Sequence, residues 1–428
     1  MNARQKLLPL FLIVLIVGCA SGISKKVRIG LQNEAIDVLN NAVLLDDYFV
    51  RSKAIDAMRD SEDQSFVPAL LDALYDYDDI IVMKASRALG ALGDTVAIPD
   101  LEFTLAFDDN FTAQKASAVA LYRLGKKDEA LEFIKNALKN ESSYNKGLMI
   151  NELTFARSDD FIPMYIEMLD DPAESVKDDA INALSLREAT LAIPNLMKTL
   201  TDSFLLVRAD AIITIAQLGD TTQIREAMNI TQKEIDRINN GELDLIVEFD
   251  EYKFNAYKIL LASTLLTELD DTTHIGYLYE LSREPMNPMS ILATIMLADW
   301  GDTNAIEKVN GFLDMDEVNI RKSVVQIVGD IDKDWACKFL IKATKDPDIE
   351  VRETATRFLR FYDKKEVKEI LTALLNDPSP EVQIEAALTL NDLGDKKGVF
   401  VLHPLLRSDD WYIKVEAAQA ILTILKTT

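Results

Sequence analysis

A helical pattern that recurs with a period of about 31 residues is the feature that most constrains the fold of this chain. The segment from Asp377 to Asp395 contains an Asp-Pro turn, an amphipathic helix around Ala386, and a Gly-Asp ending. Residues in the same helical context as Ala386, which we call markers, recur at equal spacing along the chain. They are Ala262, Ala293, Val324, Ala355 and Ala417. Self-similarity with such a period is typical of an array in which each repeat packs on its neighbours. We therefore predict one repeat array over most of the 428 residues.

The same marker position extends towards the start of the chain. Most markers lie four residues after a β-branched or apolar residue, as Val382 precedes Ala386, so the two share one face of a helix. The pattern predicts twelve units of two helices each over residues 33–428. The earlier markers follow at nearly the same spacing, and one longer step then leads to Ala262: they are Ala54, Ala85, Ser117, Met149, Ala180 and Ala211.

Two short motifs of these units resemble those of a known family. One is a Val-Arg or Val-Lys pair at the start of the second helix, as in Val50-Arg51 and Val176-Lys177, and the other is the Leu-Gly-Asp ending. Together they resemble HEAT repeats, especially the short kind of phycobilisome-lyase-type repeat proteins. The resemblance covers residues 33–428 and implies an all-α fold, an α-solenoid of about twelve HEAT-like helix pairs. It implies the binding of other molecules without identifying them.

The segment 1–18 has the pattern of an export signal. Arg4 and Lys6 precede an apolar run that is shorter than a comfortable membrane-spanning helix. The run ends in Ile16-Val17-Gly18-Cys19, which resembles the lipobox of bacterial lipoproteins. The resemblance implies that the signal peptide, 1–18, is removed and that Cys19 is acylated, with 19–32 as a tether. An ordinary signal peptide with an incidental cysteine is the alternative.

An acylated Cys19 would place the protein in the cell envelope, because several acyl chains on one residue anchor a protein firmly. Ala20 resembles the residues that permit sorting to an outer membrane. We therefore expect a protein on the outer membrane facing the periplasm, or otherwise on the outer face of the plasma membrane. The lipid anchor would be its only contact with the membrane.

The net charge of −25 limits the classes of partner. Such a field repels phosphate backbones, so we expect no nucleic acid partner. A protein partner with a basic surface is compatible with this charge. Nothing in the composition indicates an oligomeric state.

The sequence lacks the residue sets that common catalytic and metal sites need. Neither His274 nor His403 is followed by glutamate, so the repeated His-Glu ligands of a HEAT-like di-iron enzyme are missing. Asp330 begins a spacing like that of a calcium loop, but Trp335 stands where glycine is required. Cys337 lies on an apolar helix and is expected to be buried. We expect no cofactor, no metal and no enzyme activity.

Several turns between paired helices combine acidic and aromatic residues. Equivalent turns of a solenoid line up along one edge, where aromatic anchors and negative charge would suit a basic, partly apolar protein segment. The alternative is that the rings are tucked beneath the next repeat. The candidate binding residues in these turns are Tyr48, Phe49, Tyr75, Tyr77, Phe107, Phe111, Trp411 and Tyr412.

The longer step between the markers Ala211 and Ala262 marks an insertion near 221–253. Its first part predicts a lengthened helix, and an acidic and apolar run follows. Insertions in solenoids often lie on the binding face, which makes Ile246, Phe249 and Tyr252 further candidates. A merely elongated helix pair is the alternative.

Basic residues recur directly after the first apolar residue of the second helices. They could form a binding ladder, but we favour ion pairs between stacked repeats with turn acids such as Asp47, Asp171, Asp202 and Asp346. The basic residues are Arg51, Lys146, Lys177, Arg208, Arg321, Arg352 and Lys414.

The final helix, from about Tyr412 to Lys426, is apolar on more than one side. Val415, Ala418 and Leu422 lie outside the face that can pack on the preceding repeat. Because a solenoid needs a polar face on its terminal unit, we expect an open flank with weak end-to-end or partner docking. The alternative is that the three side chains fit into groove edges.

Three functions are compatible with these observations. The first is a non-catalytic, lipid-anchored protein–protein interaction scaffold of the bacterial cell envelope. The second is a dedicated structural subunit of an envelope complex. The third is a HEAT-like enzyme such as a lyase, which the missing catalytic residues disfavour.

Overall fold

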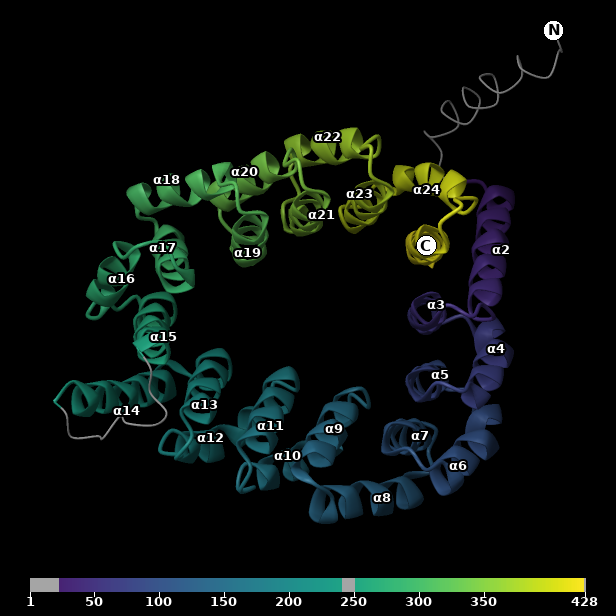
Figure 1. Ribbon diagram of the computed structural model, residues 1–428, viewed down its shortest axis with the longest axis horizontal. Coiled ribbons are helices and arrows are strands. Elements are labelled where there is room, and N and C mark those ends of the chain that lie inside the picture. Colours follow the sequence, from purple (N-terminus) through teal and green to yellow (C-terminus); the bar gives the residue numbers. More distant parts are fainter. Residues whose placement is uncertain (1–22, 241–250, 427–428) are drawn as a thin grey trace, which may run out of the picture. The chain divides into compact units, whose positions relative to one another are not determined.

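The computed structural model describes residues 23–240 and 251–426, and these ranges contain helices and no strand (Figure 1). Helices α2 to α25 follow one another as pairs, from α2 with α3 to α24 with α25. The expected all-α array of twelve helix pairs is therefore confirmed.

The described helices belong to two compact units. Unit 1 contains both ends of the described chain, up to Asp94 and from Ala336, and unit 2 contains Thr95–Trp335. The helices of unit 1 are α2 (Lys25–Ala42), α3 (Tyr48–Ser61), α4 (Val67–Asp72), α5 (Asp79–Leu92), α20 (Asp334–Ala343, except its first two residues), α21 (Ile349–Phe358), α22 (Lys365–Leu374), α23 (Pro380–Asp392), α24 (Val399–Leu405) and α25 (Trp411–Lys426).

The helices of unit 2 include the long pair at the insertion. They are α6 (Ile98–Phe107), α7 (Phe111–Arg123), α8 (Lys127–Asn140), α9 (Ser143–Thr154), α10 (Ile162–Met168), α11 (Glu174–Leu186), α12 (Ile193–Thr199), α13 (Leu205–Leu218), α14 (Thr221–Asn239), α15 (Glu251–Leu269), α16 (Ile275–Ser282), α17 (Pro288–Trp300), α18 (Thr303–Gly311) and α19 (Val318–Gly329). Short 3-10 turns adjoin several helices of both units, including η3 (Ala73–Tyr75) between α4 and α5.

The marker residues form the centre of the core, one on each second helix of a pair. Consecutive second helices pack on each other, as α3 does on α5 and α21 on α23. Small side chains at the contact allow this close approach. All twelve markers are at most 1% exposed: Ala54, Ala85, Ser117, Met149, Ala180, Ala211, Ala262, Ala293, Val324, Ala355, Ala386 and Ala417.

Glycine ends four of the described second helices in the left-handed conformation, and Gly125 after α7, with φ 93°, is one of them. Gly93, Gly301 and Gly394 have φ of 78°, 113° and 83°, which side chains other than glycine adopt at a cost. Gly219, after α13, instead has φ −81°, so this helix ends in an extended conformation. Asp302, after Gly301, accepts a hydrogen bond from the backbone N–H of Ala305 at 2.9 Å and caps α18.

The last helix of the chain packs on the first two. Within unit 1, α25 contacts α2 and α3 in addition to α23 and α24 (Figure 1). Val415, Ala418 and Leu422 are consequently 0%, 0% and 6% exposed. The prediction of an open C-terminal flank is wrong, because the first helix pair covers it. We call the contact of α25 with α2 and α3 the seam.

The insertion forms a lengthened helix pair. Helices α14 and α15 have 19 residues each and pack on each other, and both also contact α13. This packing agrees with the alternative given for the insertion, a merely elongated helix pair. Ile246 and Phe249 lie outside the described residues, as does the side chain of Tyr252 at the start of α15.

The start of the described chain is helical earlier than expected. Helix α2 begins at Lys25, and Ser24 accepts a hydrogen bond from the Val27 backbone N–H at 3.4 Å. The helix thus begins inside the expected tether, 19–32. Cys19 and the expected signal peptide lie outside the described residues. Among the described helices, none combines the length and the apolar character that crossing a membrane requires.

Candidate functional site

A ladder of ion pairs connects the turns of successive repeats. Lys146 lies 2.8 Å from Asp171, and Lys177 pairs with Asp202 in the same way. Both pairs were expected from the sequence. Two further rungs join Arg51 to Asp76 at 3.1 Å and Arg352 to Asp377 at 3.0 Å.

These rungs are structural and do not form a binding surface. The Arg352 and Asp377 side chains are 11% and 7% exposed. Arg352 also donates to the Asp346 carbonyl oxygen at 2.9 Å, in the turn between α20 and α21. Each rung therefore braces one repeat against the next, as we favoured.

The seam has a different set of polar contacts. Lys53 on α3 forms an ion pair with Glu416 on α25 and donates to the Tyr412 hydroxyl at 3.0 Å. Burial lowers the pKa of Lys53, but the Glu416 and Tyr412 oxygens outweigh that effect and hold it above its ordinary value. Near the other end of the same contact, Gln419 donates to Asp60 at 3.1 Å.

Helix α2 contributes further contacts to the seam. Arg28 donates to the Leu425 carbonyl oxygen at 2.7 Å. Glu34 lies 2.9 Å from Arg407 and 3.1 Å from His403 of the last repeat. The two ends of the described chain are thus held by apolar burial, ion pairs and hydrogen bonds together.

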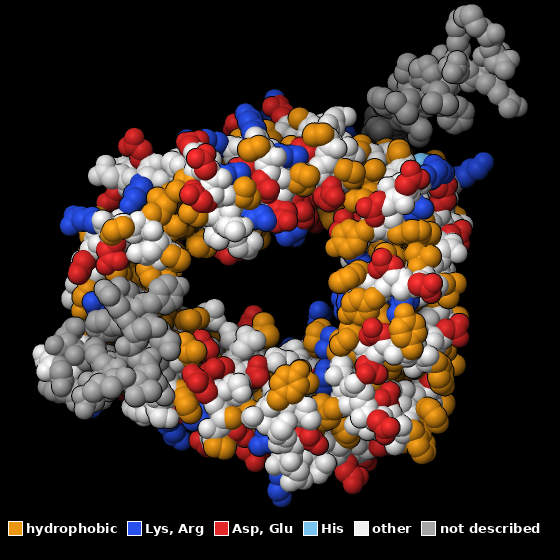
Figure 2. Space-filling view, in the orientation of Figure 1, with side chains coloured by type: hydrophobic (Ala, Val, Ile, Leu, Met, Phe, Trp, Pro, Cys, Tyr) orange, Lys and Arg blue, Asp and Glu red, His pale blue; other side chains and the backbone are white. Residues whose placement is uncertain are grey.

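The seam places predicted aromatic residues from both ends of the chain in neighbouring repeats. Because α25 packs on α3 and α3 packs on α5, the turns before these three helices are consecutive in unit 1. Figure 2 shows hydrophobic and acidic side chains next to one another in this part of unit 1. We call the following set the aromatic edge: Tyr48, Phe49, Tyr75, Tyr77, Trp411 and Tyr412.

Four rings of the aromatic edge project into solvent. The exposed fractions of Phe49, Tyr75, Tyr77 and Tyr412 are 72%, 65%, 80% and 43%. The alternative that these rings are tucked beneath the next repeat is therefore wrong for them. Tyr48 and Trp411, in contrast, are half-buried at the starts of α3 and α25.

Basic side chains of α3 hold rings from both neighbouring repeats. The Lys53 ammonium lies 4.1 Å from the centroid of the Tyr412 ring, and the Arg51 guanidinium lies 4.9 Å from that of Tyr77. Tyr48 and Phe49 lie in the repeat between those of Tyr412 and Tyr77. Their ring centroids are 5.2 Å apart in an edge-to-face arrangement. Cation–π and aromatic contacts of this kind orient the rings without burying them.

Acidic residues beside the aromatic edge cap two helices that carry its rings, α3 and α25. Asp47 accepts from the Val50 backbone N–H at 3.1 Å, and Asp410 accepts from that of Tyr412 at 2.8 Å. Asp46, Asp47, Asp409 and Asp410 are all exposed to solvent. The edge therefore offers rings and carboxylates to the solvent together.

The two remaining candidate rings belong to unit 2. Phe107 is 72% exposed and lies 5.0 Å from Phe103, between ring centroids. Phe111 is half-buried and stacks on Phe133 at 6.0 Å. Phe111 is thus partly covered by its neighbouring helix, as the alternative proposed, and Phe107 is not.

Buried charges elsewhere are enclosed structural groups. The Lys115 ammonium on α7 lies 2.6 Å from the Glu152 carboxylate on α9, with side chains 3% and 0% exposed. Removing either partner would leave a buried charge, which costs several kcal/mol, about 3–5. Cys337 is buried, as expected.

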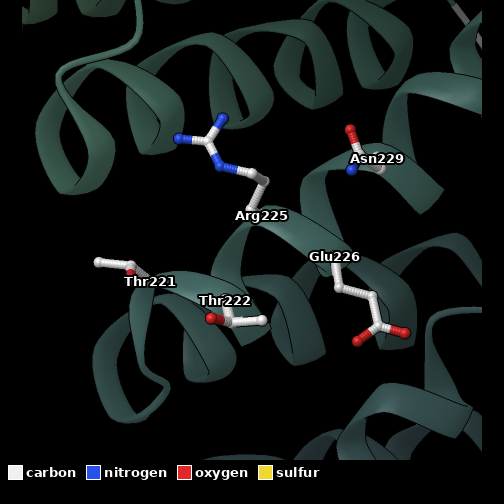
Figure 3. Close-up of a pocket in the computed structure, with 5 residues that line it drawn as sticks. All are labelled: Thr221, Thr222, Arg225, Glu226 and Asn229. Atoms are coloured by element: carbon white, nitrogen blue, oxygen red, sulfur yellow. The ribbon is translucent and has the colours of Figure 1, made fainter.

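A shallow hollow lies at the start of α14. It has a volume of about 390 Å³ and is lined by Thr221, Thr222, Arg225, Glu226 and Asn229. Figure 3 shows Arg225 and Glu226 pointing in opposite directions. Arg225 is instead 3.2 Å from Asp271, just after the end of α15. The five side chains do not converge on one point, so they form no arrangement for acid–base or nucleophilic chemistry.

Within residues 23–240 and 251–426, no group of three or more His, Cys, Asp or Glu side chains could hold a metal ion. His274 stacks on Tyr277 at 5.6 Å, and His403 lies against Glu34.

Comparison with known proteins identifies the repeats. The family model of HEAT repeats matches residues 36–122 and 337–422. These segments cover the pairs on both sides of the seam. No curated protein matches the sequence.

Several solved structures are similar at low identity. Human deoxyhypusine hydroxylase is 17% identical, with 71% of this chain and 99% of that chain covered and a TM-score of 0.26. The phycocyanin lyase complex of Nostoc sp. is 18% identical, with 61% and 93% covered and a TM-score of 0.28. Kap121p is 12% identical, with 91% and 48% covered and a TM-score of 0.39. At these values the likenesses carry no argument about activity or partners.

The sequence did not indicate the residues that hold the aromatic edge together across the seam. Lys53 and Glu416 are ordinary polar residues of two helices 363 positions apart. The apolar sides of the last helix were visible in the sequence, but they predicted an open flank and not the contact with α2 and α3.

Proposed function

This chain is a HEAT-repeat α-solenoid, and on that premise we propose that it is a non-catalytic scaffold that binds a protein partner through the aromatic edge of unit 1. Solenoids of this kind present extended surfaces for protein binding. The observation that carries the proposal is the exposure of Phe49, Tyr75 and Tyr77, at 72%, 65% and 80%, beside exposed carboxylates.

Large exposed aromatic side chains are uncommon without a binding role when they are grouped. Aromatic residues are enriched among the anchors that carry most of the free energy of protein binding, because each buries a large area with little loss of side-chain freedom. The neighbouring Asp46, Asp47, Asp409 and Asp410 favour a partner with a basic surface.

We propose further that the protein is located in the cell envelope. Its support is the run Ile16-Val17-Gly18-Cys19 after an apolar stretch, which resembles a lipobox. A lipid on Cys19 would precede α2, and unit 1 would follow the anchor directly in the chain.

The test is capture of a partner in cells by the wild type and by an edge variant. We expect Phe49→Ser with Tyr77→Ser to lose a partner that the wild type crosslinks, because two exposed anchors are removed. A loss of about 1.4–2.8 kcal/mol would be expected for two moderate anchors, which corresponds to roughly a tenfold to hundredfold weaker complex.

The matched control is Tyr144→Ser, which removes a ring that is 73% exposed on α9 of unit 2. Retention of the same partner by the edge variant would contradict the proposal. The stoichiometry of the captured complex separates a scaffold from a dedicated subunit, since a subunit would hold one partner in a fixed ratio.

A further inference from the structure

The aromatic edge presents rings that also carry hydrogen-bond donors. Tyr48, Tyr77 and Tyr412 have hydroxyl groups, and Trp411 has an indole N–H. The Tyr412 hydroxyl accepts from Lys53, so its own hydrogen is directed elsewhere. A ligand that suits this edge offers flat apolar groups and unpaired acceptors together.

The backbone of a polyproline II helix offers such acceptors. It has no internal hydrogen bonds, so its carbonyl oxygens are available to donors, whereas an α-helix uses its carbonyls internally. Its proline rings pack between aromatic side chains, and its rigidity reduces the entropy lost on binding.

The spacing of the repeats also fits this conformation. Tyr412 and Phe49 are equivalent residues of neighbouring repeats, because each lies at the same distance before its marker, Ala417 or Ala54. Equivalent residues of packed helices are separated by the interaxial distance, about 8–10 Å. One turn of polyproline II, three residues at ~3.1 Å each, advances about 9.3 Å. A β-strand places same-side residues about 6.6 Å or 13 Å apart and does not match.

The carboxylates beside the aromatic edge determine which residue types suit the ligand at the positions between its prolines. Asp46 and Asp47 lie before α3, and exposed Asp409 and Asp410 lie before α25. The basic side chain of α3 that faces α25 at the seam, Lys53, is already paired with Glu416. Arginine or lysine between the prolines of the ligand would therefore complement these carboxylates.

We infer that the aromatic edge of unit 1 binds a proline-rich segment with interspersed arginine or lysine, in the polyproline II conformation. The inference rests on the proposed function and adds the chemical class of the partner segment. The ligand would lie across the helix starts of α25, α3 and α5, so its site includes residues from both ends of the chain.

The experiment measures fluorescence anisotropy of short labelled peptides with the full-length mature chain. The probes are a peptide of repeated Pro-Pro-Arg and a flexible peptide of repeated Gly-Ser-Arg with the same length and charge. We expect the proline peptide to bind about tenfold more tightly, because it adds ring contacts and loses less freedom. Phe49→Ser with Tyr77→Ser should weaken it about tenfold, and Tyr144→Ser should not.

Tyr77→Phe tests the donor separately, since it keeps the ring and removes the hydroxyl. We expect affinity for the proline peptide between those of the wild type and Tyr77→Ser. Circular dichroism melting of each variant shows whether the fold is retained, which the 80% exposure of Tyr77 favours.

The possible outcomes test the polyproline inference and the proposed function separately. Equal binding of the two peptides would mean that charge alone attracts them, and the polyproline inference would be overturned while the edge stays a binding surface. Binding of neither peptide, with partner capture still lost in the edge variant, would overturn only the inference. Unchanged capture in the edge variant would overturn the proposed function as well.

Discussion

Asp178 on α11 is a carboxyl group whose pKa the fold raises towards neutral pH. Burial, and then the negative charges of Asp210, Glu174, Asp179 and Asp202, raise its pKa to about 7. One of its oxygens is buried and accepts no hydrogen bond. A carboxyl in this environment opposes folding whenever it is charged.

The pH dependence of stability follows from this raised pKa. Between the unfolded value of 3.8 and about 7, the folded state binds more protons than the unfolded state. The free energy of unfolding therefore falls as pH rises through this window, and the contribution is restored as the pH is lowered through it.

Asp178→Asn should remove this dependence, because asparagine does not titrate. We expect the variant to be more stable than the wild type at pH 8, by roughly 1 kcal/mol once partial exposure is allowed for. Thermal unfolding at several pH values would measure it. A wild type whose stability has the same pH slope as the variant between pH 5 and 8 would contradict the raised pKa.

At the scale of helices, the seam is a joint between repeats that do not follow each other in the chain. Helix α25 contacts α3 just as α3 contacts α5, so each of the two ends covers the apolar face of the other. An uncovered terminal repeat would expose such a face, which array proteins normally avoid with a polar cap. Packing the ends together satisfies the same requirement without a cap.

The ion pair of Lys53 with Glu416 allows a test of the seam by charge exchange. Lys53→Glu should destabilise unit 1 by about 1–2 kcal/mol, because it places two carboxylates together and removes the cation from the Tyr412 ring. Adding Glu416→Lys should restore part of the loss.

Thermal melts of the single and double variants provide the measurement. The matched control is Lys84→Glu, whose partner Asp56 lies on α3 within the N-terminal repeats. Glu416→Lys should not rescue that control. An additive double variant, with no rescue of Lys53→Glu, would mean that α25 does not meet α3 in solution.

At the scale of the whole molecule, the proposed anchor determines where the aromatic edge acts. Acylation of Cys19 would tie the protein to a membrane, while the described helices supply no span. We expect Cys19→Ser to abolish labelling by a radioactive fatty acid and to release the protein from membranes. Cys337→Ser is the control, since that thiol is buried and distant in sequence. A Cys19→Ser protein that stays membrane-bound would refute the lipid anchor if the wild type also takes up no label.

The sequence by itself determined the all-α array, the twelve helix pairs, the buried markers such as Ala386, and ion pairs such as Lys177 with Asp202. All of these depend on contacts between neighbouring repeats, which recur with the period of the sequence and are therefore visible as a pattern. The residue types of the aromatic edge were visible in the same way.

Only the tertiary structure decided which rings are exposed and what covers the last helix. Exposure of Tyr77 and burial of Leu422 depend on which side chains the next repeat places beside them. The meeting of α25 with α2 and α3 joins helices from the two ends of the described chain, and the residues of no single repeat specify this contact. A period in the sequence records packing between neighbouring repeats, whereas a contact between residues far apart in the chain is decided only in the folded protein.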